Sequence, residues 1–317
     1  MESIAEKILR LKKDKNAVIL AHNYQRGEIQ DIADFAGDSL GLSQQAAETD
    51  ADVIVFCGVH FMAETAAILS PDKKVLLPDP QSGCPMADMI TADGLRKMKS
   101  ENPGATVVCY VNTTAAVKAE SDICCTSSNA EKVVSSIPED QGVIFVPDKS
   151  LGAYVASQLG RKMTFWPGFC PTHHRILAQD VEKRKQEYPN AKVVAHPECT
   201  ADVLELADLV ASTTGIARFC RESDVKEIIV GTENGIIHRL KKESPDKTFI
   251  QVSEQATCPN MKKNTLEKVL WCLEDLNTDT DTESEHVVTV PEDIAKKARL
   301  AIERMLELSR PSPALKG

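Results

Sequence analysis

Three short apolar stretches, rich in β-branched residues, each end in a polar group of residues. They are residues 17–24 (AVILAHNY), 106–112 (TVVCYVN) and 192–198 (KVVAHPE). Runs of this kind, bounded by polar residues, are typical of buried β-strands. When His22, Tyr110 and His196 are taken as equivalent, they stand 88 and 86 residues apart. A nearly constant period of this size indicates an internal repeat.

The copies stay in register beyond the first strand. Seventeen residues after each of those positions stands a small hydroxyl residue, Ser39, Ser127 or Thr213, where a helical pattern opens. A second predicted strand follows in each copy (53–57, 142–146 and 227–230), and a third follows that (74–77, 163–166 and 248–252). A predicted helix precedes each first strand (4–13, 92–99 and 175–187).

Each third strand leads into a loop in which a cysteine is followed by proline. These cysteines, Cys84, Cys170 and Cys258, lie 62, 60 and 62 residues after the first polar position of their copy. Matched offsets at three chemically distinct positions favour a true repeat over three unrelated α/β segments.

Strands that alternate with helices predict parallel sheets. We therefore expect an α/β fold of three similar αβα units with small parallel sheets around a pseudo-threefold axis, and an active site at the central junction. The predicted units are residues 1–86, 87–172 and 173–260. Residues 261–317 add a C-terminal helical extension, whose two helical patterns are joined by an acidic linker at 277–285.

Composition narrows the possible partners. The chain of 317 residues carries 37 basic and 47 acidic side chains, a net charge of −10, and no basic block stands out. Nucleic acid is therefore disfavoured as a partner, and anionic substrates would need local hydrogen-bond donors. The N-terminal pattern lacks the apolar core of a signal peptide, and no segment reads as a membrane span. We expect a cytoplasmic protein.

The three repeat-matched cysteines predict a metal centre. Ten cysteines without an export signal argue against a disulfide framework. Three thiolates are one short of the usual four iron–sulfur ligands, and a [4Fe–4S] cluster held in this way has one iron free to act as a Lewis acid. A zinc site of three cysteines with His173 or His174 is the alternative, although no CxxC pair occurs.

The remaining cysteines are expected to pack in the interior. Free cysteine is among the most often buried residue types. The residues concerned are Cys57, Cys109, Cys124, Cys125, Cys199, Cys220 and Cys272, of which the middle three lie near the proposed junction.

The polar strand ends supply candidate catalytic groups. Tyr24, Asn112 and Glu198 follow two residues after the first polar positions and share a face with them. Acid–base chemistry suits Tyr24 and Glu198, with His196 orienting or assisting. The hydroxyls of Ser39, Ser127 and Thr213 would bind phosphate or carboxylate beside helix amides, and they would also cap those helices. Three histidines without a repeat partner, His60, His238 and His286, are expected to be structural or on the surface.

At this point the motifs closely resemble those of the quinolinate synthase family. In order along the chain they are AHNYQ (21–25), GDSL (37–40), SGCPMADM (82–89), YVNT (110–113), CTSS (125–128), WPGFC (166–170), HPEC (196–199), STTG (212–215), GTENG (231–235) and CPNMK (258–262). The resemblance spans about residues 15 to 272. It implies the same fold of three αβα units around a pseudo-threefold axis.

The resemblance also implies an activity. Quinolinate synthase condenses iminoaspartate (iminosuccinate) with dihydroxyacetone phosphate and releases phosphate and two waters; its product is the pyridine precursor of NAD. The implied cofactor is a [4Fe–4S] cluster on Cys84, Cys170 and Cys258. An L-aspartate oxidase or aspartate dehydrogenase would supply the imine. The implied substrate contacts are His22, Ser39, Tyr110, Asn112, Ser127, His196, Glu198 and Thr213, and the implied catalytic residues are Tyr24, Tyr110, His196 and Glu198.

Three other functions stay open on the sequence. One is a different enzyme with a three-cysteine cluster, of the isoprenoid-diphosphate reductase or diphthamide-synthesis type. A second is a non-catalytic iron or redox sensor, and a third is a metal-free sugar-phosphate enzyme. The register of Tyr24, Tyr110 and Glu198 across the copies argues against a sensor, which would not need them.

Overall fold

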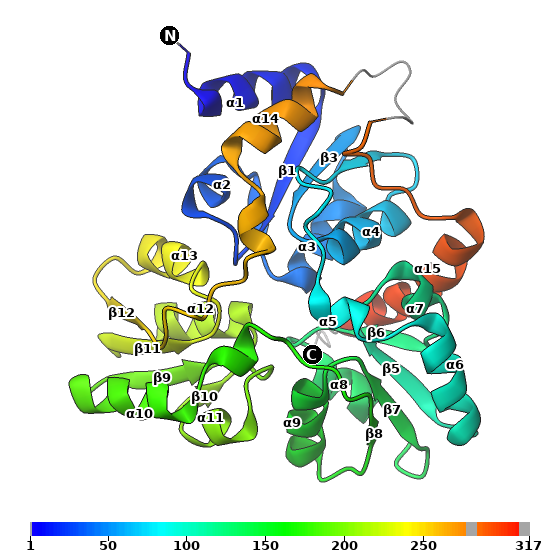
Figure 1. Ribbon diagram of the computed structural model, residues 1–317, viewed down its shortest axis with the longest axis vertical. Helices are drawn as coiled ribbons and strands as arrows, with labels where there is room; N and C mark the ends of the chain where they lie inside the picture. The colour runs from blue at the N-terminus through cyan, green and yellow to red at the C-terminus, as the bar shows by residue number, and fades with distance from the viewer. Residues whose placement is uncertain (1, 277–283, 311–317) are drawn as a thin grey trace, which may run out of the picture.

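Three small parallel sheets build the protein. The computed structural model describes residues 2–276 and 284–310, and in Figure 1 the three sheets surround the middle of the molecule. Each sheet has four parallel strands in the same order, with the second strand at one edge and the first beside it. The predicted α/β class and the threefold repeat are therefore confirmed.

The strands bear out the repeat and add one strand to each copy. Their bounds are β1 (Ala17–His22), β2 (Phe35–Gly37), β3 (Val53–Cys57) and β4 (Lys74–Leu76); β5 (Thr106–Tyr110), β6 (Ile123–Cys125), β7 (Val143–Val146) and β8 (Thr164–Phe165); and β9 (Lys192–Ala195), β10 (Leu209–Val210), β11 (Glu227–Gly231) and β12 (Thr248–Gln251). The short edge strands β2, β6 and β10 were not predicted. Two or three residues are too few to show an alternating pattern, and the equally short β4 and β8 were predicted only as the third apolar run that recurs in each copy.

Helices cover the faces of the three sheets, as parallel strands require. In the first unit they are α1 (Ile4–Asp14), α2 (Gly27–Ile32), α3 (Ser39–Glu48), α4 (His60–Leu69) and α5 (Pro85–Asp88). The second has α6 (Ala92–Glu101), α7 (Ala115–Ala119), α8 (Ala130–Ser135) and α9 (Lys149–Leu159). The third has η1 (His173–Arg175), α10 (Ala178–Glu187), α11 (Ala201–Glu205), α12 (Thr213–Glu222), α13 (Ile236–Glu243) and η2 (Met261–Lys263).

One predicted helix begins too early. The pattern over 175–187 predicts a single helix, but the structure has a short 3-10 turn that ends at Arg175 and then α10 from Ala178. The side chain of Asp180 accepts a hydrogen bond from the backbone N–H of Leu177, 3.2 Å away, and so fixes the start of the helix there.

The two C-terminal helices cover the first two units. In Figure 1, α14 (Leu266–Glu274, orange) lies beside α1, and α15 (Glu292–Ser309, red) lies beside α7. Leu270 and Leu273 pack with Ile8 and Ile19 in one apolar cluster of the first unit. Most of the predicted acidic linker, residues 277–283, lies outside the described residues, and the unit boundaries stay a prediction. In the part of the chain that the structure describes, no helix is both long and apolar enough to cross a membrane.

Candidate active site

One cavity opens where the carboxyl ends of the three sheets meet. Function gathers at such strand ends in open α/β sheets. All twelve site residues that the sequence predicts line this cavity: His22, Tyr24, Ser39, Cys84, Tyr110, Asn112, Ser127, Cys170, His196, Glu198, Thr213 and Cys258. The structure thus brings the whole predicted set together, and the role of each residue stays a prediction.

The two strand-end histidines have the same local geometry in units one and three. The backbone N–H of Tyr24 donates to Nδ1 of His22 at 3.2 Å, and that of Glu198 donates to Nδ1 of His196 at 3.3 Å. Burial lowers the pKa of both His22 and His196 to about 3. Both rings are therefore neutral near pH 7, and each carries its proton on Nε2, because Nδ1 is used as an acceptor.

The hydroxyl residues do not cap their helices. Asp38 caps α3 by accepting from the backbone N–H of Gly41, and Ser212 caps α12 by accepting from Gly215. Ser39 and Thr213 are the first helical residues instead, and the residue before α8 is Asn129. The predicted capping role is therefore wrong. The capping side chains of α3 and α12 each lie one residue before the hydroxyl residue that lines the cavity.

Two of these hydroxyl oxygens already accept a hydrogen bond from another side chain of the protein. Nε2 of His196 donates to Oγ of Ser127 at 3.1 Å, and Nδ2 of Asn23 donates to Oγ1 of Thr213 at 2.9 Å. A hydroxyl that accepts one such bond still has its own hydrogen to donate. Ser127 and Thr213 can therefore donate to an acceptor group of a bound anion.

Asn23 links units one and three. Its side chain is fully buried, and its Oδ1 accepts a hydrogen bond from Nη1 of Arg239 on α13 at 2.9 Å. The guanidinium can only donate, so it fixes which end of the Asn23 amide is the oxygen. The amide nitrogen must then face Thr213, and Arg239 in this way sets the direction of the Thr213 hydrogen bond.

Glu198 is the buried carboxylate of the cavity. Burial alone would raise its pKa, but the neighbouring His173 and His196, with hydrogen bonds from His173 and Tyr110, lower the pKa of Glu198 to about 2. Nδ1 of His173 lies 2.7 Å from Oε2 of Glu198, and Nδ2 of Asn112 lies 3.4 Å from its other oxygen. Glu198 is therefore ionised at neutral pH, although only 3 % of it is exposed.

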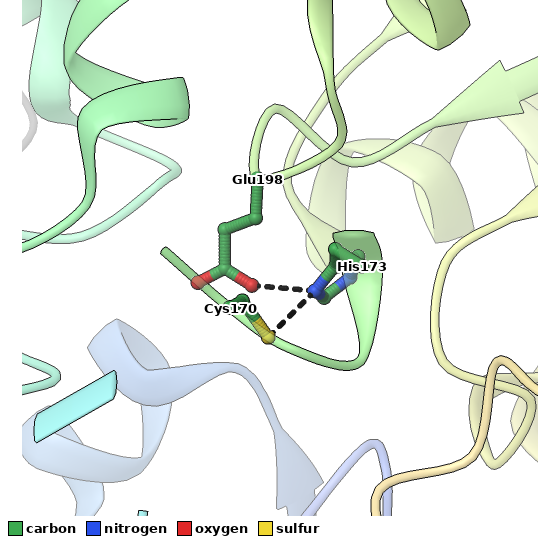
Figure 2. Close-up of side chains that lie close together, drawn as sticks. All are labelled: Cys170, His173 and Glu198. Carbon is green, nitrogen blue, oxygen red and sulfur yellow. Dashed lines mark hydrogen bonds and ion pairs between the residues drawn. The ribbon is translucent and has the colours of Figure 1, made fainter. Parts of the chain in front are cut away.

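A chain of hydrogen bonds connects Tyr24 with Glu198. Oη of Tyr24 lies 2.7 Å from Oγ1 of Thr232, and that oxygen lies 2.8 Å from Nε2 of His173. The other nitrogen of the His173 ring faces Glu198 (Figure 2). Burial, reinforced by Glu198, raises the pKa of Tyr24 well above its usual value. Tyr24 therefore starts as a protonated phenol, and the chain offers a path for a proton between the two residues.

Sequence reasoning missed several residues of the site. Thr232 lies in the GTENG motif, for which no role was inferred, and His173 was weighed only as a zinc ligand. Asn23 lies in the AHNYQ motif but was given no role, and Arg239 gave no signal, because their bonds join segments about 200 residues apart. Of the two adjacent histidines that follow Cys170, His173 is buried. His174 instead stacks on the ring of Phe169 and forms a hydrogen bond with Ser150.

The three cysteines suit an iron–sulfur cluster by their donor chemistry. Cys84, Cys170 and Cys258 each come from a different loop and reach the same cavity. Soft thiolates are the usual ligands of such clusters. Burial raises the pKa of Cys84 to about 12, so these thiols keep their protons until a cation binds.

A buried carboxylate holds the backbone of one of these loops. Oε1 of Glu233 accepts from the N–H of Cys258 at 2.9 Å. Glu233 in turn pairs with Lys262 at 2.8 Å. The other seven cysteines are buried, as predicted, and none of them lines this cavity. The residues present therefore fit a cluster held by the three predicted cysteines.

Comparison with known proteins agrees with this geometry. The sequence model of a family described as "Quinolinate synthetase A protein" matches residues 6–307. A quinolinate synthase of Dehalococcoides mccartyi (strain CBDB1) is 58 % identical over 307 residues, covering 97 % of this chain and 99 % of the relative. Quinolinate synthase 1 of Methanosarcina acetivorans is 56 % identical over 303 residues, covering 96 % of this chain and 97 % of the relative. Quinolinate synthase of Geobacter metallireducens is 54 % identical over 309 residues, covering 98 % and 99 %.

These matches decide between the enzyme classes that the sequence left open. They run almost from end to end of both chains and include the three cysteine loops, all three sheets and most of α15. The chain belongs to the quinolinate synthase family.

Proposed function

We propose that this protein condenses iminoaspartate with dihydroxyacetone phosphate to form quinolinate, releasing phosphate and two waters, and thereby serves NAD biosynthesis as a carbon–carbon bond-forming transferase. The observation that carries the proposal is the single cavity that gathers three thiols, an ionised glutamate, a protonated tyrosine and neutral donors. Family membership supports the same reaction.

The cavity binds anionic substrates through neutral donors. Nε2–H of His22 and the hydroxyls of Ser127 and Thr213 can all donate to phosphate or carboxylate oxygens, and Ser39 adds a third hydroxyl at the start of α3. Because the donors are held by the protein before the substrate arrives, little reorganisation is needed. Local donors of this kind can bind an anionic substrate even though the chain's net charge of −10 repels it.

Tyr24 and Glu198 carry the proton transfers. Isomerisation and dehydration of the substrates need a group that gives up a proton and a group that takes one. Tyr24 holds a proton at Oη and Glu198 is an ionised acceptor, and Thr232 and His173 connect them. A hydrogen bond from Tyr110 helps to keep the Glu198 carboxylate in place, and His196 lies beside it.

Cys84, Cys170 and Cys258 would hold the [4Fe–4S] cluster. When bound, a cluster with three protein ligands supplies a Lewis-acidic iron that can polarise a substrate hydroxyl or carboxylate. The chain's own contribution is to fix the Cys258 loop through Glu233 and to surround the cavity with buried side chains.

Three further proposals follow from the family and the sequence. The units 1–86, 87–172 and 173–260 act as three αβα units, with 261–317 as an extension. The protein works in the cytoplasm. Its unstable imine substrate comes from an L-aspartate oxidase or an aspartate dehydrogenase.

Asn23→Asp is expected to raise the KM of an anionic substrate about tenfold or more, with a smaller change in kcat. The new carboxylate can still accept from Arg239, but it cannot donate to Thr213. Thr213 then donates to the carboxylate instead of to the substrate, and the loss of one such hydrogen bond is worth about 1.5–3 kcal/mol. Steady-state kinetics with dihydroxyacetone phosphate and with the imine varied in turn measure the effect.

Asn264→Asp is the matched control. Asn264 is also fully buried, and its Nδ2 donates to the carbonyl of Gly58 at 2.8 Å, but it does not line the cavity. The control should lose stability and keep its KM. Equal KM values for the two variants would show that Asn23 does not orient Thr213.

The proposed reaction is tested by leaving components out of the assay. Protein purified and assayed without oxygen should form quinolinate from the two substrates with no electron donor and no S-adenosylmethionine. It should form none when either substrate is left out. A requirement for an electron donor or for S-adenosylmethionine would contradict the proposal.

A further inference from the structure

One cysteine of the cavity lies beside two other metal-binding side chains. Ligand atoms of Cys170, His173 and Glu198 all lie within 4.8 Å of one another, and in the described residues no other group of three such side chains comes this close. Nδ1 of His173 is central: it lies 2.7 Å from Oε2 of Glu198 and 3.2 Å from Sγ of Cys170 (Figure 2). Cys84 and Cys258 are not part of the group.

The three atoms form the donor set of a zinc site. Zn²⁺ binds thiolate sulfur, imidazole nitrogen and carboxylate oxygen, and zinc sites in enzymes often have three protein ligands and one open position. The three side chains line the cavity, so water or substrate can take that position. Two of the ligands carry negative charge when bound, which balances the dication in a site from which water is largely excluded.

Neighbouring residues already hold two of the ligands in place. Nε2 of His173 bonds Oγ1 of Thr232 at 2.8 Å, so the ring is held with Nδ1 toward Glu198. Tyr110 bonds the Glu198 carboxylate, and Asn112 lies 3.4 Å from its Oε1. Outer partners of this kind are the usual companions of zinc ligands. His173 and Cys170 also lie on one turn, which the bond from the N–H of His174 to the carbonyl of Cys170 closes at 3.0 Å.

We propose that the protein without its iron–sulfur cluster binds one Zn²⁺ through Cys170, His173 and Glu198, and that zinc and the cluster exclude each other because both need Cys170. Zinc binding displaces the thiol proton of Cys170 to solvent, with no change of oxidation state. The proton of His173 also leaves Nδ1, and the zinc-bound ring carries its proton on Nε2, from which it can donate to Oγ1 of Thr232. The mutual exclusion rests on the proposed function, which places the cluster on the same cysteine. The zinc site itself rests only on the geometry of the three side chains.

Zinc titration of cluster-free protein tests the site. The protein is stripped of iron anaerobically with a reductant and a chelator and is titrated with Zn²⁺ against a chromophoric competitor. One equivalent should bind. Cys170→Ala and His173→Asn should each weaken binding by about 100-fold or more, since even outer-shell changes cost 10- to 100-fold. Co²⁺ in place of zinc should show a thiolate charge-transfer band that Cys170→Ala abolishes.

The other two cluster cysteines provide the matched controls. Cys84→Ala and Cys258→Ala each remove a cavity thiol but no ligand of the proposed site. They should bind zinc within about threefold of the unaltered protein. If either variant weakened zinc binding as much as Cys170→Ala does, the ion would be held by the three cysteines and the proposal would be wrong. Full-strength binding by His173→Asn, with native circular dichroism, would also overturn it.

Cluster reconstitution tests the exclusion. Iron and sulfide are supplied anaerobically to protein with and without one equivalent of Zn²⁺. Zinc should suppress cluster formation in the unaltered protein and should not do so in His173→Asn, which keeps all three cluster cysteines. Equal cluster formation with and without zinc would contradict the exclusion. If no cluster forms even without zinc, the proposed function fails, while the titration still decides the zinc site.

Discussion

Cys170→Ala is expected to abolish both iron binding and quinolinate formation, with activity reduced at least about 1,000-fold. Cys84→Ala and Cys258→Ala should do the same, because each removes one of three ligands that come from three separate loops. With two thiolates left, the cavity has too few ligands to retain a [4Fe–4S] cluster. Iron and sulfide analysis of anaerobically purified protein, together with chromatographic detection of quinolinate, measures both losses.

Cys199→Ala is the control for these variants. Cys199 is fully buried directly after Glu198, and its Sγ approaches the carbonyl of Gly231 at 3.4 Å, but it does not line the cavity. This variant should keep its iron and most of its activity. Quinolinate formation by Cys170→Ala with no iron bound would refute the assignment of the cofactor.

Glu198→Gln is expected to retain the cluster and to lower kcat by about 10²- to 10⁴-fold, the usual contribution of a positioned proton-transfer group. The amide can still accept from His173, but it cannot take up a proton at neutral pH. The barrier should therefore rise by about 3–5 kcal/mol. Single-turnover measurement of quinolinate formation, on protein with a measured iron content, separates this effect from loss of the cluster.

Two comparisons sharpen the prediction for Glu198. Glu64→Gln is the control variant. The carboxylate of Glu64 accepts a hydrogen bond from the backbone N–H of Ala115 at 3.0 Å, and Glu64 does not line the active-site cavity. It should keep kcat within about threefold.

Tyr24→Phe removes the opposite end of the hydrogen-bond chain. Because groups that act as one unit are not additive, the double variant of Tyr24 and Glu198 should lose no more than the worse single variant. Additive losses would show that the two residues act separately.

Much of the fold was accessible from the sequence because the repeat is chemical as well as hydrophobic. Parallel strands bring their carboxyl ends to one edge, so equivalent residues such as His22 and His196 had to meet once three copies surrounded a common centre. The structure confirms the three sheets and places the predicted residues around one cavity. The short edge strand β10 left no pattern to detect.

The missing parts of the site depend on contacts between units. Asn23 and Thr213 are 190 residues apart in the chain, and nothing in either segment indicates the other. The neighbours His173 and His174 look alike in the sequence, and only packing buries the first against Thr232 and leaves the second partly exposed. The hydroxyl residues were correctly placed at or near helix starts, but the caps are neighbouring side chains such as Asp38.

The most direct test of the proposed function is an anaerobic assay of the purified protein with iminoaspartate and dihydroxyacetone phosphate. Iron and sulfide are measured on the same sample. About four irons and four sulfides per chain, with quinolinate and phosphate formed in equal amounts, are the predicted result. Protein that holds the cluster and consumes neither substrate, or that forms quinolinate at the same rate after all iron has been removed, would contradict it.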